Sequence, residues 1–254
     1  MRVLTADGVD IAYEVAGVGP PVLLIHGFAS TARINWIDTG WVRTLTDAGY
    51  LAVTFDNRGH GASTKLYDPA SYSTAAMAGD ALRLINHLEL SHVVAMGYSM
   101  GARIAARLAI DHERSLRGLV LAGLAANMVR GLRDAEVIAR GLETETPGAI
   151  EDPEARKFRA FAEQSKGDRP ALAACMRGGR DGITPEELGR IRSPTLVVAG
   201  ENDPTAGPVA PLVSAVPGAR GVTLPGRNHM SAVGDKGHKA AVLEFLASVP
   251  MPAD

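Results

Sequence analysis

The sequence predicts a doubly wound, mainly parallel α/β sheet that carries an inserted helical segment. Short apolar runs recur along the chain, and stretches with helical spacing lie between several of them. Strands covered by helices on both faces are typically unbroken apolar runs, and alternation of such strands with helices is typical of a parallel sheet. The insertion is predicted because this alternation stops between residues 124 and 190.

The chain begins with a predicted hairpin. Residues 3–5 and 11–15 alternate in part between apolar and polar side chains, and the turn-forming pair Asp7-Gly8 lies between them. Two such segments around a glycine-containing turn indicate antiparallel strands. We expect this hairpin at one end of the sheet.

The central strands follow a break that is rich in glycine and proline at residues 17–21. The first of them, V-L-L-I at 22–25, is an uninterrupted apolar run. Runs of the same kind lie at residues 51–55, 93–96, 119–122 and 195–199, with a weaker sixth at 222–224.

Helices are predicted where apolar residues recur at intervals of three or four. One such group precedes the strand at 93–96 and consists of Met77, Ala81, Ile85 and Leu88. Side chains at this spacing share one face of a helix. The last helix is predicted by an apolar group near the C-terminus, namely Val242, Leu243, Phe245 and Leu246, which forms a stripe to be buried.

The segment 124–190 differs from the rest of the chain. Polar and apolar residues mix in it, Pro147, Pro153 and Pro170 interrupt it, and no strand-like run precedes Pro194. We interpret this segment as a helical cap inserted into one core domain made of residues 1–123 and 191–254.

Composition narrows the class of protein. With 46% hydrophobic and 21% charged residues in 254, the chain has the make-up of a globular protein with a sizeable core. A net charge of −2 without runs of like charge favours neither a nucleic-acid nor a membrane partner, and no apolar stretch approaches the roughly 20 residues of a spanning helix. The single cysteine, Cys175, is expected as a small buried residue, and the cytoplasm is the expected location.

The strongest chemical signal is the motif G-Y-S-M-G at residues 97–101. It directly follows the strand at 93–96 and directly precedes a good helix-forming segment at 102–109. This strand, turn and helix context is the one in which a G-x-S-x-G serine serves as a nucleophile. Side chains at Gly97 and Gly101 would collide with neighbouring backbone in so sharp a turn, so the motif predicts Ser99 as the nucleophile.

With this motif, the chain resembles the α/β-hydrolase superfamily over essentially its whole length. In that superfamily the nucleophile, the acid and the histidine follow one another in that order. The G-E-N-D-P segment after the strand at 195–199 matches the loop that supplies the acid, which implies Asp203; by its place in the motif, Glu201 is the less favoured carboxylate. The G-R-N-H segment after residues 222–224 matches the histidine loop and implies His229.

These residue types suit acyl transfer. A serine hydroxyl is a weak nucleophile until a base accepts its proton, and His229 is expected to be that base while Asp203 orients its imidazole. The H-G-F segment at 26–28 matches the family's oxyanion loop, so the resemblance implies the main-chain N–H groups of Phe28 and Met100 as oxyanion donors.

Other residues near these motifs have secondary roles in the prediction. The D-N-R-G-H-G-A-S segment at 56–63 is expected to brace the oxyanion loop through charged hydrogen bonds, and its His60 lies outside the expected position of the base. Tyr98, Arg103 and Trp36 are secondary candidates for substrate contact. For Trp36, as for Trp41, packing over the sheet is the favoured alternative to a place in an acyl pocket.

No cofactor or metal is expected. The remaining histidines are scattered, no H-E-x-x-H or paired-cysteine spacing occurs, and no phosphate-binding glycine motif follows a strand.

The expected function is therefore serine-dependent hydrolysis of a carboxylic ester or a related small-molecule acyl substrate. A lactonase or a C–C bond hydrolase is an alternative, because fold and triad are shared across such enzymes. A proton-abstracting lyase resembling the menaquinone-pathway enzyme is another, because Arg103 lies four residues after Ser99. A ligand receptor that keeps the triad is the alternative from a different class. The sequence leaves the natural substrate, pocket size and oligomeric state open.

Overall fold

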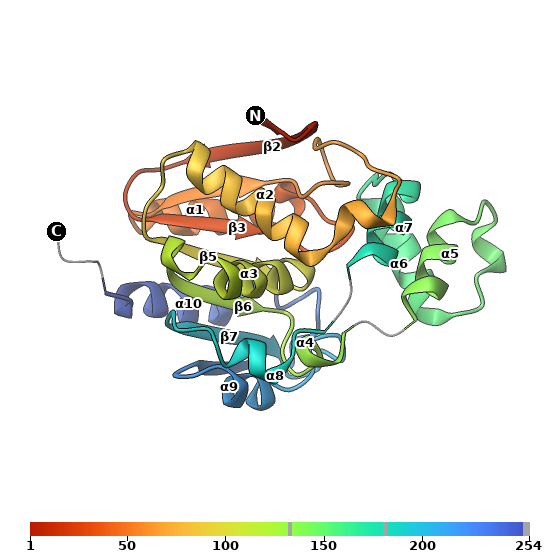
Figure 1. Cartoon of the computed structure of the whole chain (residues 1–254). Helices are drawn as coiled ribbons and strands as arrows, with labels where there is room; N and C mark the ends of the chain where they lie inside the picture. Colours follow the sequence, from red (N-terminus) through yellow and green to blue (C-terminus); the bar gives the residue numbers. More distant parts are fainter. Residues whose placement is uncertain (132–133, 180–181, 251–254) are drawn as a thin grey trace.

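The computed structural model describes residues 1–131, 134–179 and 182–250, and is built around one eight-stranded sheet (Figure 1). The strand order is β1-β2-β4-β3-β5-β6-β7-β8. Strands β3 to β8 run parallel to one another, and β1 and β2 are antiparallel additions at one edge. The predicted doubly wound, mainly parallel sheet is confirmed. The strands are β1 (Arg2–Ala6), β2 (Val9–Ala16), β3 (Pro21–Ile25), β4 (Leu51–Phe55), β5 (Val93–Tyr98), β6 (Leu116–Ala122), β7 (Thr195–Gly200) and β8 (Arg220–Leu224).

The predicted hairpin is also confirmed. Strands β1 and β2 pair from Arg2 opposite Tyr13 to Ala6 opposite Val9. The two turn residues, Asp7 and Gly8, have φ values of 53° and 75°, the left-handed conformation that a tight two-residue hairpin turn requires. The hairpin lies at the edge of the sheet, as expected.

Helices cover both faces of the sheet and create two apolar cores. On one face, α2 (Thr74–His87) and α3 (Met100–Asp111) pack against strand residues such as Leu23 and Ala95. On the other face, α1 (Trp41–Asp47) and α10 (Lys236–Ser248) pack against the alternate residues, such as Leu24 and Met96 (Figure 1). Successive strand side chains point to opposite faces, which is why one apolar run supplies both cores.

Several elements extend beyond their predicted limits. Strand β5 continues through Gly97 and Tyr98, which pair with Leu121 and Ala122 of β6. Gly97 was expected to begin the turn, but it lies within the strand, and its lack of a side chain allows the turn at Ser99 to pack closely against it. Helix α2 contains the predicted apolar face, except that Leu88 lies at its C-cap.

The remaining short elements connect these layers. They are η1 (Arg33–Ile37), which is a π-helical turn, together with η2 (Pro69–Tyr72), η3 (Glu113–Ser115) and α9 (Ala210–Ala215). Every helix in the described part of the chain is too short or too polar to traverse a bilayer.

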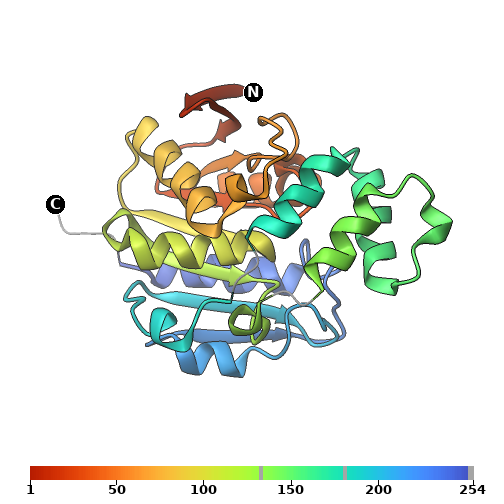
Figure 2. The same cartoon turned by 45° about the vertical axis from the view of Figure 1, so that its right-hand side comes forward.

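Within the described residues of 124–190, the chain forms helices and loops only. The helices are α4 (Asn127–Arg130), α5 (Ala135–Glu143), η4 (Pro147–Ala149), α6 (Pro153–Gln164), α7 (Arg169–Gly178) and α8 (Pro185–Leu188). Both views show α5, α6 and α7 beyond the ends of the strands, to one side of the sheet (Figures 1 and 2). Buried Arg159 donates to the carbonyl oxygens of Gly141 and Leu142 at the end of α5, and Arg177 pairs with Glu136 and Glu143, so polar contacts hold these helices together.

Candidate active site

Ser99 lies at the turn between β5 and α3. Its backbone has φ 56° and ψ −115°, a conformation that L-residues rarely adopt. The turn is held in the sheet, because the Ser99 N–H donates to the carbonyl oxygen of Ala122 at 2.8 Å. A non-glycine residue in such a strained conformation at the end of a strand is a common feature of functional sites.

The two glycines of the motif make this turn sterically feasible. A Cβ atom at Gly97 would lie 2.0 Å from the carbonyl oxygen of Gly101, and one at Gly101 would lie 1.9 Å from that of Ile25. The predicted collisions are confirmed. The second contact also shows that the first turn of α3 packs against the end of β3, where the oxyanion loop begins.

Asp203 and His229 are brought together from loops that follow β7 and β8. The His229 Nδ1 atom is 2.8 Å from Asp203 Oδ2. The other oxygen, Oδ1, accepts hydrogen bonds from the N–H groups of Thr205 and Ala206, both at 3.0 Å. Asp203 is 4% exposed, and its carboxylate receives three hydrogen bonds. Because a carboxylate only accepts, this geometry assigns the proton to Nδ1 of His229 and leaves Nε2 as the acceptor. In this conformation no hydrogen bond among the described residues joins Ser99 Oγ to His229, a contact that often forms only with substrate.

Glu201, the less favoured acid, has a different contact. Its Oε2 accepts from the Gly226 N–H at 2.8 Å, so it joins the loop after β7 to the loop after β8. This bond supports the start of the loop that carries His229, and Glu201 makes no described contact with His229 itself.

The loop that carries His229 is also held from the α1 and α10 face. The Trp41 Nε1 group donates to the carbonyl oxygen of Val233 at 2.7 Å, and His238 Nδ1 lies 3.0 Å from that of Ala232. Both aromatic side chains are buried. Burial lowers the pKa of His238 to about 4, so the ring is neutral near neutral pH and donates through Nδ1.

The predicted oxyanion loop is held by two buried asparagines: Asn57 belongs to the segment 56–63 that was expected to brace it, and Asn35 was missed by sequence reasoning. The Gly27 N–H donates to Asn35 Oδ1 at 3.1 Å, and Asn57 Nδ2 donates to the carbonyl oxygen of His26 at 3.2 Å. These two groups belong to the same peptide unit, so the asparagines hold it from opposite sides. The Cβ position of Gly27 is 3.5 Å from Ser99 Cβ, which places this peptide beside the serine.

Two histidines brace the same loop as neutral rings. His26 Nδ1 lies 2.7 Å from the Gly27 carbonyl oxygen, and its Nε2 accepts from the Asn57 N–H at 3.0 Å. His60 Nε2 accepts from the Ala29 N–H at 3.1 Å. Burial lowers the pKa of His26, in keeping with its role as a hydrogen-bond acceptor.

The charged hydrogen bonds expected of residues 56–63 are made by Asp56 and Arg58, which make no described hydrogen bond to the Gly27 peptide itself. Asp56 accepts from the N–H groups of Ala32 and Ala62, and buried Arg58 forms a two-pronged ion pair with Asp80 at 2.6 and 2.8 Å. In this segment the imidazole of His60 contacts the loop directly, and the charged Arg58–Asp80 pair lies behind the segment.

The two expected oxyanion donors have different settings. Met100 is the first residue of α3, where main-chain N–H groups have no helical acceptor. Phe28 follows the clamped peptide, and its ring packs edge-on against Phe158 of α6 at 5.6 Å. The segment 124–190 thus touches the oxyanion loop through an aromatic pair.

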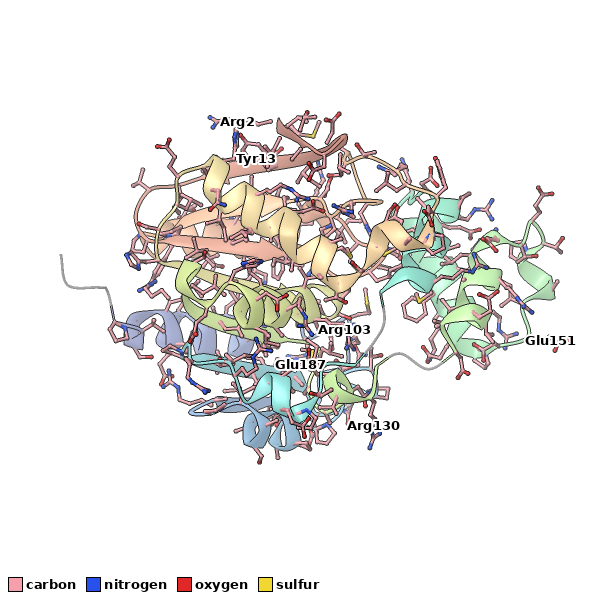
Figure 3. All side chains as sticks on the ribbon, in the orientation of Figure 1. Arg2, Tyr13, Arg103, Arg130, Glu151 and Glu187 are labelled. Carbon is pink, nitrogen blue, oxygen red and sulfur yellow. The ribbon has the colours of Figure 1, made fainter. Side chains whose placement is uncertain are left out.

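The three secondary candidates for substrate contact all face protein groups. The Tyr98 hydroxyl donates to the main-chain oxygen of His229 at 2.6 Å. Arg103, on α3 beside the start of α4, donates to the carbonyl oxygens of Asn127 and Met128 (Figure 3). Trp36 is fully buried in the α1 and α10 core, so the packing interpretation is the one that this structure supports.

The acid loop is tied to the start of the segment 124–190. Asn127 Nδ2 donates to the carbonyl oxygens of Pro204 and Thr205 at 2.9 and 3.0 Å, and its N–H donates to that of Ala206. A hollow of about 470 Å³ lies beside this loop, lined by residues 199–204 and 207–209 and by Thr223. Neither Ser99 nor His229 lines this hollow, so it is not assigned as the place where a substrate carbonyl would meet Ser99. No cluster of three or more potential metal-ligating side chains was found in the described part of the chain.

Comparisons with known proteins agree with this architecture. Residues 20–176 match the family model of the alpha/beta hydrolase fold. A non-heme chloroperoxidase from Kitasatospora aureofaciens is 30% identical over 224 residues, which cover 78% of this chain and 80% of that protein. A 3-oxoadipate enol-lactonase from Acinetobacter baylyi is 27% identical over 215 residues, 79% of each protein. The crystal structure of a hydrolase from Pseudomonas aeruginosa superposes with a TM-score of 0.79 at 29% identity, covering 97% of this chain and 98% of that one.

Proposed function

The chain belongs to the alpha/beta hydrolase family, and on this premise we propose that it is a serine hydrolase that cleaves carboxylic esters or related acyl substrates. The observation that carries the proposal is the His229–Asp203 pair at 2.8 Å, on loops beside a serine held in a strained turn. A nucleophile, an oriented base and nearby main-chain donors are the parts that acyl transfer requires.

In the proposed first step, Ser99 Oγ attacks the substrate carbonyl carbon while His229 Nε2 accepts the hydroxyl proton. Asp203 keeps the Nδ1 proton on its own side and stabilises the imidazolium that forms. The two N–H groups that bind its Oδ1 keep the carboxylate fixed during this change.

The negative charge that develops on the carbonyl oxygen needs donors already in place. We assign this role to the N–H groups of Phe28 and Met100, the second of which also benefits from the positive end of α3. The peptide before Phe28 is clamped by Asn35 and Asn57, so the loop does not have to reorganise when charge develops.

Collapse of the tetrahedral intermediate expels the alcohol, which takes the proton from His229, and leaves Ser99 acylated. Water then attacks the acyl carbonyl as His229 accepts its proton, and Ser99 is released with the carboxylic acid. Every proton in this cycle passes through His229 Nε2.

Residues 124–190 are proposed as a cap that selects the substrate over a core of residues 1–123 and 191–254. Two contacts support this role: Phe158 packs against Phe28 of the proposed oxyanion loop, and Asn127 donates to the loop that carries Asp203. A lactone is a cyclic ester and would follow the same steps, which is why the enol-lactonase relative is informative for the choice of substrates.

The contacts of Arg103 bear on the lyase alternative. Its side chain is 5% exposed and already donates to two carbonyl oxygens at the start of α4. Binding an anionic substrate there would require these contacts to break, and for this reason we favour hydrolysis of an uncharged acyl group.

The proposal is tested with a chain-length series of p-nitrophenyl esters and a small set of lactones, using wild type, Ser99→Ala and the control Ser115→Ala. Ser115 ends η3 and precedes β6, so it lies beyond the end of α3 opposite to Ser99. We expect turnover or a pre-steady-state burst that Ser99→Ala abolishes and Ser115→Ala retains, together with covalent labelling of Ser99 by a fluorophosphonate.

A folded wild-type protein that neither turns over nor is labelled would overturn the proposal. A parallel assay of peroxide-dependent halogenation covers the activity named for the chloroperoxidase relative. Ligand-induced thermal stabilisation without turnover would favour the receptor alternative.

A further inference from the structure

The Tyr98 hydroxyl connects the nucleophile strand to the histidine loop. It donates to the main-chain oxygen of His229 at 2.6 Å, across 131 residues of sequence. Among the described contacts, this is the one hydrogen bond that joins β5 to the loop between β8 and α10. Its donor lies one residue before Ser99, and its acceptor belongs to the expected base.

The Tyr98 side chain is held in one place. It is 3% exposed, and its ring lies 5.4 Å from the His229 ring. Gly123, with φ 64°, leaves the space that the ring occupies, because a Cβ there would lie 2.6 Å from Tyr98 Cζ. Burial raises the pKa of the Tyr98 phenol far above its usual range, so the hydroxyl stays protonated and remains a donor.

His229 therefore has two fixed points. Asp203 holds its imidazole through Nδ1, and Tyr98 holds its main chain. One point alone would leave the ring free to shift with its loop, whereas two points define where Nε2 lies relative to the serine turn. The turn itself belongs to the same rigid strand end as Tyr98, since Tyr98 pairs with Ala122 and Ser99 N–H bonds to the same residue.

We propose that Tyr98 is a positioning residue that sets the location of the His229 main chain relative to Ser99 through its hydroxyl. The inference rests on the proposed serine-hydrolase function for its kinetic consequence. It does not make Tyr98 a substrate contact or a proton donor in the reaction.

The test compares Tyr98→Phe with Tyr13→Phe as a matched control. Both changes remove a buried hydroxyl that makes one long-range hydrogen bond, since Tyr13 is 5% exposed and its hydroxyl lies 3.1 Å from His87 Nε2. We expect Tyr98→Phe to lower kcat by about 10- to 100-fold with KM changed by less than about twofold, as for a misplaced catalytic group. Tyr13→Phe should keep both constants.

A second measurement does not depend on turnover. A proton on His229 Nδ1 that is hydrogen-bonded to the Asp203 carboxylate gives a far-downfield NMR signal. We expect this signal to broaden or vanish in Tyr98→Phe and to persist in Tyr13→Phe. A signal and a kcat that both match wild type in folded Tyr98→Phe would overturn the inference. If wild type hydrolyses no ester but the signal still depends on Tyr98, the proposed function fails while the positioning role stands.

Discussion

Acid should destabilise this protein in part through His238, and replacing that residue should reduce the effect. The ring is fully buried and packs against Trp41 at 4.9 Å, and burial lowers its pKa from 6.5 to about 4. The unfolded chain therefore binds more protons than the folded one between these two values. Stability falls as the pH falls from about 6.5 to about 4, because stability rises with pH wherever the unfolded state holds more protons.

The magnitude follows from the two pKa values. At about 1.4 kcal/mol for each pKa unit, full protonation below pH 4 would cost about 3 kcal/mol, and the share already lost at pH 5 is about 2 kcal/mol. His238→Asn removes the titrating group and keeps a side-chain donor that can reach the Ala232 oxygen. We expect the drop in unfolding free energy between pH 7 and pH 5 to be smaller by about 2 kcal/mol in this variant.

The assay is urea denaturation at pH 5, 6, 7 and 8, followed by tryptophan fluorescence, since Trp41 contacts the ring. Overall stability at pH 7 should also fall because packing is lost, so the comparison is between pH slopes and not absolute values. The same substitution at exposed His112 controls for the general effect of removing a histidine. An unchanged slope in His238→Asn would show that this ring does not account for acid sensitivity.

Three further predictions concern the proposed site. Asp203→Asn should reduce kcat by about 10⁴-fold through loss of the correct tautomer, while Glu201→Gln should retain activity within about tenfold; equal losses would contradict the assignment of the acid. Asn35→Leu should lower kcat by up to about 10²-fold because the Gly27 N–H loses its acceptor. The unpaired Gly27 N–H should cost about 1–3 kcal/mol of stability, offset in part by removal of the buried Asn35 Nδ2, which has no described partner; a larger loss would point to a structural role. Phe158→Ala should shift the preferred ester toward longer acyl chains in the p-nitrophenyl series, and an unchanged profile would place the acyl group elsewhere.

Local sequence patterns were sufficient for the sheet and for the sharp turn at Ser99. Unbroken apolar runs at residues 22–25 and 93–96 mark strands covered on both faces, and the structure places them side by side at the centre of the sheet. The G-x-S-x-G motif marked the turn, steric reasoning required glycine at 97 and 101, and contacts near 2 Å at both positions agree with it. These features depend on neighbours in sequence or on chain-wide periodicity, which a single sequence contains.

The supporting residues could not be predicted in the same way. Asn57 binds a carbonyl 31 residues away, and Tyr98 binds one 131 residues away, and in both cases the acceptor is main chain. A backbone carbonyl exists at every position, so no residue type marks the partner. In the segment 124–190 the apolar residues pack into the main core, but the contacts that Arg159 and Arg177 make between its helices are polar, and an apolar pattern does not reveal them.

The bond network around Asn127 has a consequence for evolution and engineering. Its side chain holds the acid loop, while the Ile183 N–H donates to the carbonyl oxygen of Met128 and so joins the outgoing and returning chain. The start of the segment 124–190 thus helps to hold the loop that carries Asp203. On the proposed assignment of the acid, a graft that replaces Asn127 would disturb the loop that carries Asp203, whereas an exchange of residues 134–179 would keep these two hydrogen bonds and would test whether that segment selects the substrate.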